Sequence, residues 1–100
     1  MTLVQQHIDQ IRELCKVHHV KSLFAFGSVV SGRMTKDSDI DLVVDIDRKD
    51  PLEYTDDYFA LKFQLERVFE RPVDLLEAKS IRNPFLKKQI DATKTLVYGR

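Results

Sequence analysis

The sequence contains a single cysteine, Cys15, no tryptophan, and only three glycines and three prolines in 100 residues. One cysteine cannot form an internal disulfide, which excludes a disulfide-rich scaffold and fits a reducing compartment. No apolar run approaches the roughly 20 residues of a membrane-spanning helix, and the N-terminal residues lack the apolar stretch of a signal peptide. We therefore expect a soluble, cytoplasmic protein that does not bind membranes.

The sequence also lacks net charge, because 16 lysines and arginines balance 16 aspartates and glutamates. A neutral chain creates no global electrostatic field that would hold nucleic acid. There are no internal repeats, linkers or low-complexity tracts. The length suits one domain with a modest core, so we expect a single domain over residues 1–100.

Apolar periodicity predicts helices alternating with short strands. The predicted helices cover residues 2–18, 28–33, 56–70 and 84–90, the predicted strands cover 20–26, 39–47 and 73–76, and a short apolar segment follows at 95–98. This order is typical of an α/β (α+β) fold in which helices pack on a small mixed sheet.

Some side chains are open to two interpretations. Asp50-Pro51 is expected to break the strand, and Asp56 and Asp57 to start the following helix. Aromatic residues Tyr54, Phe59 and Phe63 exceed what one helix face needs; we expect core, with a partner-docking surface as the alternative. His18 and His19 have no predicted partner, Cys15 falls on an apolar helix stripe, and Asp45 is expected at a solvated strand end.

The most informative motif is Gly27-Ser28, followed after ten residues by Asp39-Ile40-Asp41. Gly27 has no Cβ and lets the backbone approach a phosphate closely. Ser28 adds a hydroxyl and an N–H at the start of a short helix, where anions are favoured. Asp39 and Asp41 are two apart in a strand and so project from one face. Paired carboxylates suit Mg²⁺, and the motif predicts a site for a metal-bound nucleoside triphosphate.

The segments Phe24-Ala25-Phe26-Gly27-Ser28 and Ser38-Asp39-Ile40-Asp41-Leu42-Val43-Val44 resemble the minimal nucleotidyltransferase (MNT) family of the DNA polymerase beta-like superfamily. The resemblance extends over nearly the whole chain and implies the nucleotidyltransferase fold. It also implies transfer of a nucleoside monophosphate, usually AMP from ATP, with two Mg²⁺ ions as cofactors. Family members of this size are often antitoxins that adenylylate a tyrosine of a HEPN-domain ribonuclease toxin, so a HEPN toxin is the implied partner in a hetero-oligomer.

The resemblance further implies a third carboxylate on the strand after the long helix. Asp74 occupies that place, and Glu77 ranks well below it. With Asp39 and Asp41, Asp74 would form the catalytic and metal-binding set.

Gly27 and Ser28 would bind the phosphates. Many relatives carry arginines directly after Gly-Ser, where this chain has Val29, Val30 and Ser31. Arg33 and Lys36 are therefore the candidate triphosphate contacts.

Two other functions stay open. The chain could be a non-catalytic module that neutralises its partner by occlusion, or it could transfer a nucleotide to a small molecule or RNA. Its short length disfavours the second, because larger relatives use an extra domain to hold such acceptors. Dependence of partner neutralisation on Asp41 would separate catalysis from occlusion.

Overall fold

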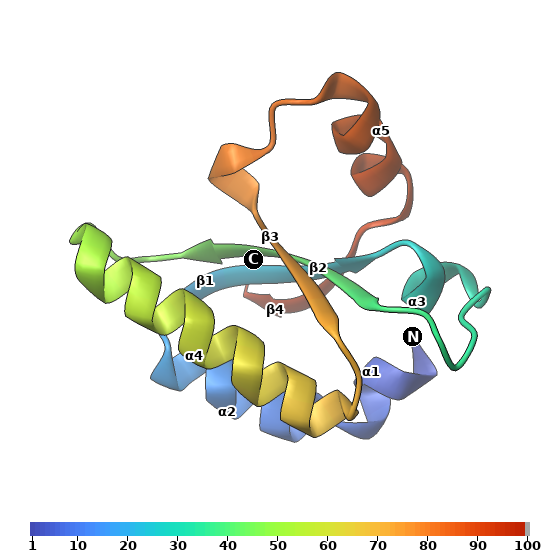
Figure 1. Cartoon of the computed structure of the whole chain (residues 1–100), viewed down its shortest axis with the longest axis horizontal. Coiled ribbons are helices and arrows are strands. Elements are labelled where there is room, and N and C mark those ends of the chain that lie inside the picture. Colours follow the sequence, from blue (N-terminus) through green and yellow to red (C-terminus); the bar gives the residue numbers. More distant parts are fainter. Residues whose placement is uncertain (100) are drawn as a thin grey trace.

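The computed structural model describes residues 1–99, in which helices surround a four-stranded sheet (Figure 1). In chain order the elements are α1 (Thr2–Gln6), α2 (Ile8–Val17), β1 (Val20–Phe26), α3 (Ser28–Ser31), β2 (Ile40–Ile46), α4 (Pro51–Phe69), β3 (Val73–Glu77), the 3₁₀ helix η1 (Ala78–Ser80), α5 (Pro84–Thr93) and β4 (Thr95–Gly99).

The sheet has the strand order β3-β2-β1-β4. β1 pairs antiparallel with both β2 and β4, whereas β2 and β3 are parallel. A parallel pair needs a long crossover connection, and α4 supplies it between β2 and β3. The predicted mixed sheet with packed helices is confirmed, and the apolar segment at 95–98 proves to be its fourth strand.

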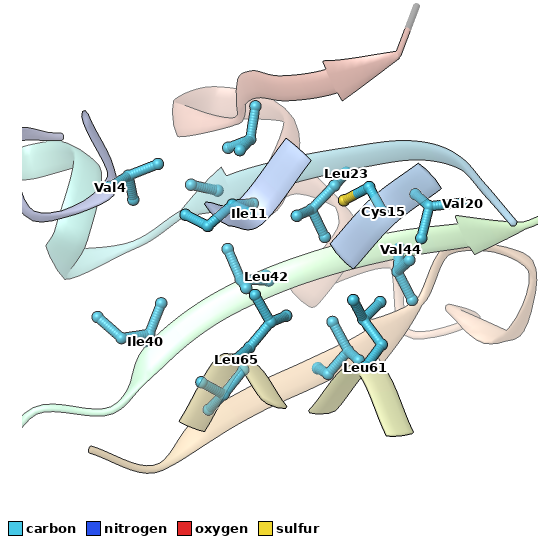
Figure 2. Close-up of a cluster of buried hydrophobic side chains, with 14 of the residues drawn as sticks. Val4, Ile11, Cys15, Val20, Leu23, Ile40, Leu42, Val44, Leu61 and Leu65 are labelled. Carbon is cyan, nitrogen blue, oxygen red and sulfur yellow. The ribbon is translucent and has the colours of Figure 1, made fainter. Parts of the chain in front are cut away.

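The main core lies between one face of the sheet and helices α2 and α4, which Figure 1 shows on the same side. Successive side chains of a strand point to opposite faces, and alternate residues of β2 are accordingly buried in this core. Figure 2 shows how they meet side chains from both helices; the labelled set includes Ile11, Cys15, Ile40, Leu42, Val44, Leu61 and Leu65.

Cys15 is a core residue, as its place on the apolar helix stripe predicts. It is fully buried, and burial raises the pKa of its thiol to about 12. Since the thiolate is the reactive form, Cys15 contributes packing rather than nucleophilic chemistry.

Three predicted helix boundaries are wrong. The last helix, α5, runs to Thr93 rather than to residue 90. The first helix is interrupted at His7, so α1 and α2 are separate. The long helix α4 starts at Pro51, five residues before the predicted start, because the Asp50 carboxylate accepts a hydrogen bond from the Leu52 N–H at 2.8 Å. An aspartate N-cap followed by proline at the first helical position is a helix start, and the same dipeptide was interpreted as a strand breaker only.

The aromatic residues on α4 also differ from expectation. Phe59 and Phe63 are 44% and 57% exposed, so they are not core residues. Their rings stack on the helix surface with centroids 6.0 Å apart. Tyr54, by contrast, is half-buried and packs against the main core.

Asp57 does not start a helix but lies inside α4, where it forms an ion-pair cluster. Its carboxylate lies 3.2 Å from His18 Nδ1, 3.5 Å from His19 Nδ1 and 3.0 Å from Arg48 Nε. The two histidines, which were expected to have no partner, thus join the end of α2 to α4. Within residues 1–99 no helix is both long and apolar enough to cross a membrane.

The Asp57 cluster predicts an acid-sensitive contribution to stability. Burial alone would raise the pKa of Asp57, but hydrogen bonds from His18 and Arg48, together with the charges of Arg48 and His19, hold it below its usual value. A carboxyl whose pKa is lowered by folding stabilises the protein above its unfolded pKa, and this contribution is lost as the pH falls through the folded pKa. We expect Asp57→Asn to lower the free energy of unfolding at pH 7 by about 1.5–3 kcal/mol, the usual range for a charged hydrogen bond.

Urea denaturation at pH 7 and at pH 3 measures the effect. The difference between wild type and Asp57→Asn should shrink at pH 3, whereas the exposed neighbour Asp56→Asn should have little effect at either pH. A deficit of Asp57→Asn that is the same at both pH values would contradict the assignment.

Candidate active site

The Gly27-Ser28 turn lies where β1 ends and α3 begins. Gly27 has φ 71° and ψ −143°, a combination that essentially only glycine adopts. Gly32, also with positive φ, ends the short helix as predicted. A Cβ added to Gly27 would lie 2.8 Å from Asp41 Oδ2. The missing side chain therefore allows the turn to lie directly against the Asp41 carboxylate.

Three carboxylates gather beside this turn. On β2, Asp41 is the register partner of Phe26 in β1 and of Asp74 in β3. Asp39 precedes Asp41 by two residues and lies immediately before the same strand. Burial raises the pKa of Asp41, and the negative charges of Asp74 and Asp39 raise it further. Asp74 and Asp39 are thus each close enough to Asp41 to repel its charge.

This repulsion identifies a place where a cation would be stabilised. No group of three or more Asp, Glu, His or Cys side chains in residues 1–99 forms a ready-made metal cage. Mg²⁺, however, is usually held by one or two carboxylates together with substrate phosphates and water. Carboxylate oxygens beside the turn at the start of a helix fit a cation that arrives with phosphate ligands.

Arg33 and Lys36 lie in the segment between α3 and β2. Both side chains are exposed to solvent. Their proposed contact with the triphosphate stays a prediction.

Thr93, at the end of α5, is a contact that the sequence interpretation missed. Its Oγ1 accepts a hydrogen bond from the Gly27 N–H at 3.1 Å. That N–H is therefore already paired, and the N–H groups of Val30 and Ser31 donate to the Gly27 carbonyl. The groups left for phosphate are the Ser28 hydroxyl and the N–H groups of Ser28 and Val29 at the start of α3. The two residues are 66 positions apart, so no local pattern could have linked them.

Arg71 is a second missed residue, interpreted from sequence only as part of a helix end. Its Nη1 donates to the carbonyl oxygens of Thr35 and Ser38, each at 3.0 Å. These carbonyls belong to the loop that leads into Asp39. Arg71 thus helps to place the first carboxylate.

The remaining acids lie farther along the sheet. Asp45 was expected at a solvated strand end, but its side chain is only 18% exposed and lies 3.3 Å from Lys79 Nζ. Glu77 is the register partner of Val44 and accepts a hydrogen bond from Ser80. Glu77 is three positions after Asp74 on β3, which is about 10 Å at 3.3 Å per residue. Glu77 therefore lies away from the Asp39, Asp41 and Asp74 carboxylates.

Known proteins share both this sequence pattern and this architecture. Residues 5–97 match the family model described as a nucleotidyltransferase domain. One relative is a candidate protein adenylyltransferase of Methanocaldococcus jannaschii, 34% identical over 99 residues, which cover 91% of this chain and 96% of the relative. A second such protein from the same organism is 34% identical over 96 residues, covering 96% of this chain and 90% of the relative.

Solved structures have the same fold. A minimal nucleotidyltransferase aligns with a TM-score of 0.75 at 27% identity, over 92% of this chain and 90% of the other. A toxin–antitoxin structure with AMP-PNP aligns with a TM-score of 0.71 at 22% identity, over 93% and 73% of the two chains. A complex of the tri-AMPylated Shewanella oneidensis HEPN toxin with its MNT antitoxin aligns with a TM-score of 0.65 at 20% identity, over 96% and 72%.

The motif that suggested the resemblance lies within the matched residues, and the predicted sheet and helices have the family's arrangement. With the family model spanning residues 5–97, the chain belongs to the nucleotidyltransferase domain family.

Proposed function

We propose that this chain is a Mg²⁺-dependent protein adenylyltransferase. It transfers AMP from ATP to a hydroxyl, in our proposal a tyrosine hydroxyl, of a HEPN-domain toxin and thereby acts as the antitoxin. The observation that carries the proposal is the grouping of Asp39, Asp41 and Asp74 on one face of the sheet, with Asp41 against the Gly27 turn.

The chemistry needs one nucleophile, one leaving group and one proton acceptor. The acceptor oxygen attacks the α-phosphorus of ATP, the bond from that phosphorus to the β-phosphate oxygen breaks, and pyrophosphate leaves. The hydroxyl proton passes to a carboxylate; the exposed Asp74 is the candidate because it borders the site on the side away from the turn. Such transfers depend mainly on positioning and electrostatic stabilisation.

Each end of the site has its own task. Asp39 and Asp41, with Asp74, would hold Mg²⁺, which when bound neutralises charge on the phosphoryl oxygens. Ser28, through its hydroxyl and N–H, would hold the β- and γ-phosphates beside Gly27. Arg33 and Lys36 would add positive charge from the neighbouring exposed loop.

The proposed substrates are supported by relatives of this chain. Two relatives that cover most of it are candidate protein adenylyltransferases. Structures of the same fold include one with AMP-PNP and one in which an MNT antitoxin accompanies a tri-AMPylated HEPN toxin. We therefore propose ATP as the nucleotide substrate of this chain, a protein as its acceptor and a HEPN-domain protein as its partner.

One observation favours occlusion as the alternative. Phe59 and Phe63 present stacked, exposed rings on α4, and exposed aromatic residues are common at protein interfaces. A partner bound there would be neutralised without any transfer, so the test must separate binding from modification.

Asp41→Asn is expected to abolish transfer without unfolding the protein. The substitution removes a metal ligand and also a charge that Asp74 and Asp39 repel, so the melting temperature of the metal-free protein should rise. A HEPN-domain protein, the proposed partner, is co-expressed with each variant, and its intact mass is measured. Wild type and the exposed control Asp47→Asn should add adenylyl groups, and Asp41→Asn should add none.

The same experiment separates the alternatives. An unmodified partner that is nevertheless silenced and co-purifies with both wild type and Asp41→Asn would establish occlusion. Full modification by Asp41→Asn would rule out the assigned metal site.

Gly27→Ala is expected to abolish MgATP binding. Its new Cβ would meet the Asp41 carboxylate at 2.8 Å, whereas a Cβ at Gly32 would meet nothing within 4 Å. Both glycines have positive φ, but Gly32 lies in the left-handed helical region, which other residues enter at a modest cost. Gly32→Ala therefore controls for replacing a positive-φ glycine, although its backbone strain is smaller than that of Gly27→Ala.

Isothermal titration with MgATP, accompanied by thermal melting, measures both effects. Gly32→Ala should lose stability yet keep binding. Equal loss of binding in the two variants would show that strain, rather than the contact with Asp41, explains the effect.

A further inference from the structure

A cavity of about 200 Å³ lies on the face of the sheet that carries Asp41, opposite to the main core. α5 and the segment around η1 cover it, and Figure 1 shows both on the side of the sheet away from α2 and α4. Its apolar walls are Phe24 and Val43 from the sheet, Ile81 after η1, and Ile90 from α5. Nothing described so far uses this space.

The cavity is adjacent to the carboxylates. Phe24 and Val43 are register partners, as are Phe26 and Asp41. The two pairs are two residues apart along the strands, about 7 Å at 3.3 Å per residue. The hydrogen bond from Gly27 to Thr93 also joins the Gly27-Ser28 turn to α5, which forms a wall of the cavity.

Its lining suits a flat heteroaromatic ring with polar edges. The walls offer an aromatic ring and aliphatic side chains, which pack against the faces of such a ring. At the rim, Lys94 Nζ lies 5.3 Å from the centre of the Phe24 ring and 3.3 Å from the Asp91 carboxylate. The rim therefore offers both a hydrogen-bond donor and an acceptor.

We propose, building on the proposed function, that this cavity receives the base of the nucleoside triphosphate whose phosphates lie at the Gly27-Ser28 turn. With phosphates at the turn and the α-phosphate near Asp41, the ribose would extend along β1 and β2 and deliver the base over Phe24 and Val43.

The acceptor has a different direction of approach. In an in-line transfer it must attack from the side opposite the leaving pyrophosphate. The turn that takes the pyrophosphate follows β1, and Asp74 lies on β3, across the sheet from it. The acceptor therefore enters beside Asp74, which leaves the cavity to the nucleotide.

Ala78 permits a test that fills the cavity without touching the carboxylates. It lines the cavity at the start of η1 and is an exposed residue. Ala78→Phe should raise the dissociation constant of MgATP about tenfold, in keeping with the loss of base stacking. Binding of magnesium tripolyphosphate, which has no base, should not change. Ala92→Phe, at an exposed α5 position outside the cavity lining, is the matched control and should bind both ligands like wild type.

The outcomes separate this proposal from the proposed function. Unchanged MgATP binding by Ala78→Phe would overturn the base site, and unchanged MgATP binding with reduced transfer to the partner would assign the cavity to the acceptor instead. If Ala78→Phe lost both ligands through misfolding, the smaller Ala78→Leu gives the same comparison. A wild-type chain that bound neither ligand would overturn the nucleotidyltransferase proposal together with the base site.

Discussion

The alternation of side chains along β2 is the constraint on which the rest of the structure depends. Ile40, Leu42 and Val44 are buried against the helices, and the residues between them must then face the other side of the sheet. Burying the apolar set fixes the register of β2, because a shift by one residue would exchange the two faces. The position of Asp41 is therefore stabilised by the core rather than by its own interactions, which are repulsive.

The parallel pairing of β2 with β3 extends this constraint to the third carboxylate. α4 must cross the core face to connect the two strands, and Leu61 and Leu65 on its inner side are fully buried there. Val73 and Leu75 are buried on β3 in the same way, which turns Asp74 to the face of Asp41. The long helix thus positions an acid on the opposite face of the sheet, and the core stability offsets the cost of the charge grouping.

The sequence predicted what local periodicity encodes. The alternation in β2 and the Gly27-Ser28 turn follow from spacings of a few residues, and the fold class followed from the order of the periodic segments. The choice of Asp74 as the third carboxylate came from the resemblance to the family. The start of α4 was missed because Asp50-Pro51 fits both a strand breaker and a helix cap, and only the hydrogen bond to Leu52 decides between them. The exposure of Phe59 was missed because residue type predicts burial only on average.

Two contacts between segments that are distant in the sequence could not be predicted from local patterns. Both position parts of the candidate site. Arg71 holds the loop before Asp39, and Thr93 holds the Gly27 N–H. Arg71 and Thr93 both follow β2 in the sequence, whereas the Gly27-Ser28 turn and Asp39 precede it. The site is therefore positioned only once the fold is complete. Because α5 carries Thr93 and also contributes Ile90 to the cavity wall, a displacement of α5 would affect the Gly27-Ser28 turn and the cavity together. In the proposed nucleotide complex, this one helix would therefore fix the distance between the phosphate site and the base site.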